Sequence, residues 1–183
     1  MELIDAFNIA LEAAGLRQIS DINLDDAQTQ QLDTLLAREK RQVQYDGYPF
    51  NTTRMNLTVN IDNEIEVSGF LRVELPQGFT VLDDKVFDPR NNKFHDEDLN
   101  DIWVISNRQW DDIPEQFQEW IARRVAARFV SAISGPDDTY SEARIREAQA
   151  FSAAHLSDDA EWDVSVLAER RIRVQRGGFG SWR

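Results

Sequence analysis

The sequence predicts an α+β fold: a four-helix bundle with a β-rich insert between helices 2 and 3 and an extended C-terminal arm. Two observations support this prediction. Apolar residues recur at helical spacing in the first and last thirds of the chain, whereas the stretch between them alternates apolar and polar residues and is rich in turn residues. We therefore expect a bundle from residues 1–46 and 111–160, an insert from residues 47–110, and an arm from residues 161–183.

The strongest helix signal covers residues 112–134. Asp112 is expected to accept hydrogen bonds from first-turn N–H groups, Glu115 stands at the capping-box position, and Pro114 falls in the first turn, where a missing N–H costs little. Gly135-Pro136 ends the pattern. Ile113, Phe117, Trp120 and Ile121 are predicted to lie in the core. They belong to a longer apolar stripe with helical spacing: Ile113, Phe117, Trp120, Ile121, Val125, Phe129 and Ile133.

Three further helices are expected. The first covers residues 2–15 and ends at a glycine, and the second covers residues 24–45, with aspartates in its first turn and basic residues in its last. The fourth is capped by Asp137 or Asp138 and runs to about Leu156. The second helix has a narrow apolar face that includes a carboxylate, and this face is formed by Leu32, Leu35, Leu36, Glu39 and Val43.

The insert is predicted to consist of short strands. Residues 56–61 and 64–67 alternate around Asp62-Asn63, which indicates a hairpin. Further strands are expected at residues 70–75, 85–87 and 101–106. Aromatic residues are abundant here, and we expect them to fill the core unless they are exposed, in which case they would mark a protein–protein surface: Tyr48, Phe50, Phe70, Phe79, Phe87, Phe94 and Trp103.

The C-terminal arm is basic, and its apolar residues have a period of two, which is typical of an added strand or an extended arm. Residues 169–183 carry five arginines and one glutamate, a net charge of +4, which leaves −17 for the rest of a chain whose total is −13. An acidic body argues against general DNA binding, whereas the arm could bind nucleic acid or dock on an acidic protein surface. We predict that the arm binds a partner through Trp162, Val164, Val166, Arg170, Arg171, Ile172, Arg173, Val174, Arg176, Phe179 and Trp182.

Signals for catalysis are weak. The chain has no cysteine, and its histidines, His95 and His155, lie in different segments without a ligand-spaced partner. Paired carboxylates such as Asp111-Asp112 could supply the acid and base of a glycan hydrolase, but several pairs open predicted helices as caps. No cofactor or metal motif, membrane-length apolar run or basic signal-peptide region is present. We predict a protein without catalytic activity, cofactor or membrane partner.

Three motifs together resemble one known family. Residues 38–51 (REKRQVQYDGYPFN) end a helix and continue into a Gly-aromatic-x-Phe-Asn signature, residues 85–94 (KVFDPRNNKF) resemble a hairpin, and residues 112–121 (DIPEQFQEWI) resemble a Pro-Glu-x-Phe-x-x-Trp-Ile helix entry. In order and spacing, about residues 1–160 resemble tail tubular protein A, the head–tail adaptor of short-tailed bacteriophages. The chain departs from this pattern at Tyr48, where Trp is usual, and at Pro49, where an aromatic residue is common.

The resemblance implies a structural protein of the virion tail that is made in the host cytoplasm. It implies a homo-oligomeric ring, a dodecamer in the family, between the portal protein and a nozzle protein of the tail tubular protein B type. The helical part would face the portal and the β-rich part the nozzle. Genomic DNA would pass through the ring without specific binding, since an acidic channel wall repels phosphates. The arginines of the arm would pair with acidic residues of the portal or of a neighbouring subunit.

Two other functions remain open on the residues alone. One is a tail-associated glycan hydrolase that uses a carboxylate pair. The other is a nucleic-acid-binding module that acts through the basic arm.

Overall fold

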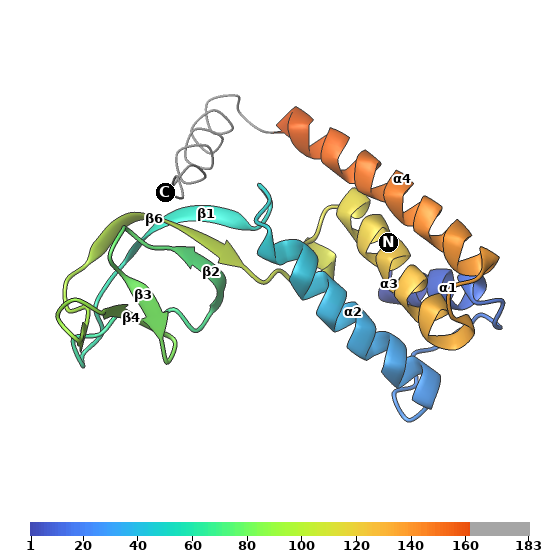
Figure 1. Ribbon diagram of the computed structural model, residues 1–183, viewed down its shortest axis with the longest axis horizontal. Coiled ribbons are helices and arrows are strands. Elements are labelled where there is room, and N and C mark those ends of the chain that lie inside the picture. The colour runs from blue at the N-terminus through green and yellow to red at the C-terminus, as the bar shows by residue number, and fades with distance from the viewer. Residues whose placement is uncertain (162–183) are drawn as a thin grey trace, which may run out of the picture.

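A helical part and a β-rich part lie side by side and are joined where one helix ends and the last strand returns (Figure 1). The computed structural model describes residues 1–161, apart from the side chains of residues 157–161. Its helices are α1 Leu3–Ala13, α2 Ala27–Tyr45, α3 Glu115–Ser134 and α4 Asp138–Glu161. Its strands are β1 Thr52–Leu57, β2 Phe70–Glu74, β3 Thr80–Leu82, β4 Lys85–Asp88, β5 Lys93–Phe94 and β6 Leu99–Ser106. This order confirms the predicted α+β class, with the strands between the second and third helices.

Helix α3 is the centre of the helical part, because α1, α2 and α4 all pack against it. Phe117, Ile121 and Phe129 are at most 2% exposed, and burial of each such side chain contributes about 2–3 kcal/mol. The predicted apolar stripe is confirmed except at Ile133, which is 49% exposed. The last buried residue of α3 is Val130, so Ile133 lies beyond the core.

The predicted cap of α3 is wrong. Asp112 belongs to a separate short 3-10 helix, Trp110–Asp112, and the residue that precedes α3 is Pro114, which forms no side-chain cap. A proline restricts the residue before it to extended backbone, and Ile113 has ψ 132°. Ile113 therefore separates the two helices, and α3 begins at Glu115.

The ends of the other helices follow their predicted chemistry only in part, because α2 has no acidic residue in its first turn and no basic residue in its last. Asp26 accepts a hydrogen bond from the backbone N–H of Thr29 at 2.9 Å, so α2 begins three residues later than predicted. Asp137 accepts from the N–H of Tyr140 at 2.8 Å, which confirms it as the cap of α4. After α1, Gly15 has φ +67°, the left-handed conformation that commonly ends a helix. Helix α4 continues five residues past the predicted end.

The β-rich part contains two small antiparallel sheets, with strand orders β1-β6-β2 and β3-β4-β5. Strands β2, β4 and β6 correspond to the segments predicted at residues 70–75, 85–87 and 101–106. The short strands β3 and β5 were not predicted. The two sheets enclose a core cluster of Leu57, Ile65, Val67, Val86, Ile102 and Val104.

The predicted hairpin of residues 56–61 and 64–67 is wrong. Strand β1 ends at Leu57 and pairs with β6, whereas residues 64–67 contribute only an isolated bridge between Glu66 and Lys85. The tight turn itself exists, because the N–H of Asn60 donates to the carbonyl oxygen of Glu64 at 2.8 Å. At Leu57, Ile65 and Val67 the alternation reports burial rather than strand pairing, whereas Ile61 is 98% exposed.

The aromatic residues of the β-rich segment fill space between its elements. Of the seven named above, Tyr48 is buried and the other six are half-buried. Tyr48 and Phe50 reach out of the segment and pack on Phe117 of α3, with ring centroids 4.6 and 4.9 Å away. Core filling therefore explains these residues better than an exposed protein–protein surface does.

Two fully buried amide side chains, those of Gln44 and Asn51, join the helical and β-rich parts. Gln44 accepts from the N–H of Arg108 at 2.7 Å and donates to the carbonyl oxygen of Arg108 at 3.2 Å. Asn51 accepts from the N–H of Tyr48 at 2.8 Å and donates to the carbonyl oxygens of Gln44, at 2.8 Å, and Ser106, at 3.2 Å. These bonds hold the outgoing chain after α2 against the returning chain after β6.

Replacing Asn51 with alanine is expected to lower the free energy of unfolding by about 2–3 kcal/mol, because it leaves buried backbone groups without partners. Urea denaturation followed by tryptophan fluorescence measures this change. Asn100→Ala is the matched control, since Asn100 is exposed and should cost less than about 0.5 kcal/mol. Equal losses for the two variants would contradict the assigned role of Asn51.

Candidate interaction surfaces

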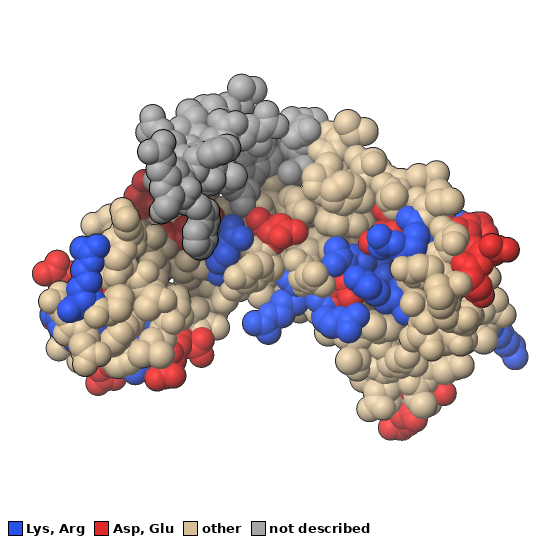
Figure 2. All heavy atoms as spheres, in the orientation of Figure 1, with Lys and Arg blue, Asp and Glu red and all other residues tan. Residues whose placement is uncertain are grey.

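Three arginines surround one buried carboxylate between α2 and α3. Glu39 is 1% exposed. Its Oε1 accepts from Nη2 of Arg38 at 2.8 Å, and its Oε2 accepts from Nε of Arg124 at 2.6 Å. Nε of Arg128 lies 3.9 Å from Oε1. We call Arg38, Arg124 and Arg128 the arginine cluster. Figure 2 shows Lys and Arg side chains gathered over the helical part on this face.

The ionisation of Glu39 depends on these arginines. Burial alone would raise the pKa of its carboxyl group, but the hydrogen bonds and positive charges of Arg38 and Arg124 outweigh burial, and the pKa lies below its usual value of 4.5. Glu39 is therefore charged in the folded protein at neutral pH. The ion pair joins residues 85 positions apart in the chain and ties α2 to α3.

The arginine cluster was missed in the sequence, although one signal pointed to it. Glu39 lies on the predicted apolar face of the second helix, and a carboxylate in such a position needs a buried cation. Arg124 and Arg128 also lie in a predicted helix, but their spacing along that helix does not show which other helix they face. Only the packing of α2 on α3 brings the charges together.

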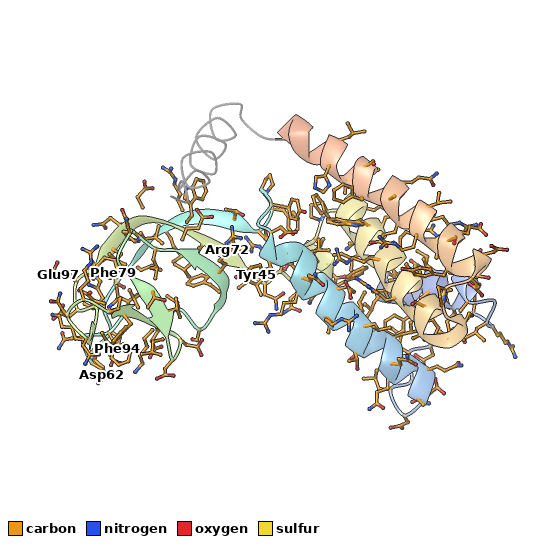
Figure 3. All side chains as sticks on the ribbon, in the orientation of Figure 1. Tyr45, Asp62, Arg72, Phe79, Phe94 and Glu97 are labelled. Carbon is orange, nitrogen blue, oxygen red and sulfur yellow. The ribbon has the colours of Figure 1, made fainter. Side chains whose placement is uncertain are left out.

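An open groove of about 630 Å³ runs between the end of α2 and strands β2 and β3. Six consecutive residues, 70–75, line it, and because alternate residues of a strand point to opposite faces, the groove must follow the edge of β2. Within the described residues β2 pairs with β6 alone. Arg72 bridges the parts: it donates to the carbonyl oxygen of Tyr45 at 3.2 Å, and its guanidinium lies 5.5 Å from the Tyr45 ring (Figure 3).

The histidines pack against aromatic rings. His155 lies against Trp120 and Phe151, with ring centroids 5.5 and 4.0 Å away, and His95 lies 4.5 Å from Phe79. In the described part of the chain, no group of three or more His, Cys, Asp or Glu side chains is arranged to hold a metal ion. Both histidines therefore take part in aromatic packing.

The paired carboxylates occupy caps and turns where the structure describes them. Asp26 and Asp137 cap helices. Asp83 and Asp84 both have positive φ in the turn between β3 and β4. Asp111 and Asp112 are exposed in the 3-10 helix. The side chains of Asp158 and Asp159 lie outside the described set.

The predicted partner-binding residues of the arm, Trp162 to Trp182, lie outside the described residues, so their role stays a prediction. Among residues 1–161, none of the helices combines the length and the apolar character needed to cross a lipid bilayer.

Replacing Glu39 with glutamine is expected to lower the free energy of unfolding at pH 7 by about 3 kcal/mol, because Arg124 then loses its buried counter-charge. The folded-state pKa of Glu39 is below the unfolded value, so this stabilisation is present above about pH 4.5 and is lost as pH falls through the folded pKa. Urea titrations from neutral to acidic pH should show the two proteins converging in acid. The exposed Glu12→Gln is the control, and an unchanged gap in acid would contradict the argument.

Comparison with known proteins gives two findings that agree with each other. A family model described as Tail tubular protein matches residues 4–163. Tail tubular protein A of Klebsiella phage KP34 is 24% identical over 181 residues, covering 96% of this chain and 90% of the relative. The family match spans the helical part, the β-rich part and both passages of the chain between them. This chain therefore belongs to the tail tubular protein family, a family of structural phage tail components.

Proposed function

We propose that the chain is the head–tail adaptor of a short-tailed bacteriophage, and that twelve copies form a ring between the portal protein and a tail nozzle protein of the tail tubular protein B type. The single observation that supports this most is the family match over residues 4–163. Residues 1–46 and 111–160 would act as one unit facing the portal, and residues 47–110 as a second unit facing the nozzle.

The two-part architecture suits this role. An adaptor must contact different proteins at its two axial ends, and the chain offers a helical surface at one end and small sheets at the other (Figure 1). The joint formed by Gln44 and Asn51 is buried and fully hydrogen-bonded. A change in one part would therefore be transmitted to the other rather than absorbed between them.

The arm would complete the contacts of the ring. Its period-two apolar residues suit addition to an exposed strand edge, and β2 offers such an edge along the groove. Its arginines would pair with carboxylates of the portal or of a neighbouring subunit. The acidic body would repel DNA phosphates, so that the genome passes through the channel without specific binding.

The proposal predicts closed rings of the full-length chain, alone or on addition of its portal, in negative-stain images and in mass measurements of the purified proteins. The expected result is a ring that binds portal at one end and nozzle at the other. A chain that associates with neither protein under any condition would count decisively against the adaptor role.

Deleting residues 169–183 tests the arm. We expect the shortened chain to bind portal or neighbouring subunits more weakly, because five arginines are lost. A labelled DNA duplex provides the comparison. Salt-dependent duplex binding by the full chain that disappears on deletion would instead favour a nucleic-acid-binding module.

A further inference from the structure

We infer that the arginine cluster is a docking surface for carboxylates on a second copy of this chain. The inference rests on the proposed function, because it names a contact through which neighbouring subunits of the ring would recognise one another. Three properties of the cluster support it: a surplus of positive charge, a fixed position, and a contrast with the charge of the rest of the protein.

The three arginines of the cluster carry more positive charge than Glu39 neutralises. Among the described residues, Glu39 is the one carboxylate in ion-pair contact with Arg38, Arg124 and Arg128. Three guanidinium groups therefore share a single negative charge, and arginine stays protonated in proteins. Like charges this close repel one another, and a second anion would relieve the repulsion.

The cluster is both held in place and accessible. Arg124 is 17% exposed and is fixed by its bond to Glu39, whereas the side chains of Arg38 and Arg128 are 60% and 48% exposed. At 3.9 Å from Glu39, Arg128 makes an ion pair too long for a hydrogen bond. Its planar group of N–H donors is thus available for a bidentate contact with a carboxylate.

The net charge of the whole chain favours a second copy, rather than DNA, as the partner that the cluster binds. At a net charge of −13, each copy carries surplus carboxylates, including the exposed Asp111 and Asp112, which have no ion-pair partner among the described residues. The same net charge repels duplex DNA at long range. In a head-to-tail ring the two faces that meet are different, so a basic cluster on one copy can face carboxylates of the next.

The test uses the full-length chain with Arg38→Gln and Arg128→Gln combined. Arg124 is kept because it is the least exposed of the three arginines and joins Glu39 of α2 to α3. The matched control combines Arg17→Gln and Arg90→Gln, the same loss of charge at exposed arginines elsewhere. A third protein combines Arg38→Lys and Arg128→Lys, which keeps the charge but removes the bidentate geometry. Sedimentation velocity at low and high salt measures association between copies, and urea midpoints check folding.

We expect the double variant with Arg38→Gln and Arg128→Gln, the glutamine pair, to raise the dissociation constant between copies about tenfold or more. Most of the salt dependence of this association should also disappear. The control pair should associate like the unmodified chain, and the lysine pair should fall between them. If the glutamine pair does not fold, the double variant with Arg38→Lys and Arg128→Lys replaces it in the test. That variant should associate more weakly than the unmodified chain, with unchanged salt dependence.

Three outcomes would overturn the inference. If the folded glutamine pair forms rings with unchanged affinity and salt dependence, the cluster is not the contact, although the ring function stands. If the unmodified chain stays monomeric at every concentration and with portal present, both the inference and the ring fail. If the unmodified chain binds a labelled DNA duplex and the glutamine pair does not, the cluster binds nucleic acid rather than a second copy.

Discussion

Two buried amides decide how the rest of the molecule is arranged. The chain leaves the helical part after α2 and returns after β6, and Gln44 and Asn51 bind these two passages to each other. An amide side chain suits this position because it donates and accepts at once. The Gly-aromatic-x-Phe-Asn motif is thus a structural joint: Gly47 has φ +77°, Tyr48 and Phe50 pack on α3, and Asn51 closes the turn.

Helix α3 connects this joint to the rest of the helical part. Its first turn receives the two aromatic rings through Phe117, and two turns further on Arg124 binds Glu39 of α2. The ring contacts hold the chain just after the end of α2 against α3, and the ion pair holds α2 itself against α3. The direction of α2 then sets where the β-rich part begins. The ion pair at Glu39 and the amide joint therefore act on the same geometry, although one is electrostatic and the other consists of neutral hydrogen bonds.

Local patterns predicted most features that lie within one element, although they misplaced the start of α3, and they missed the contacts between two elements. The stripe of α3 and the caps at Asp26 and Asp137 follow from local sequence, and the structure contains them. The hairpin prediction failed because alternation does not identify the partner of a strand: β1 pairs with β6, more than forty residues away. The arginine cluster joins α2 to α3 across an even larger gap, 85 positions in the sequence. Its functional assignment needed the packing, which no single stretch of the sequence contains.

The charge distribution then places constraints on any ring built from this chain. A channel that conducts DNA benefits from negative walls, but copies that are uniformly negative repel one another. A local surplus of positive charge resolves this conflict only if it lies between subunits, where neighbouring carboxylates cover it. Glu39 makes such an arrangement possible, because its buried charge holds the arginines together in the free chain without neutralising them fully. The acidic surplus can then face the channel while the contact between subunits remains attractive.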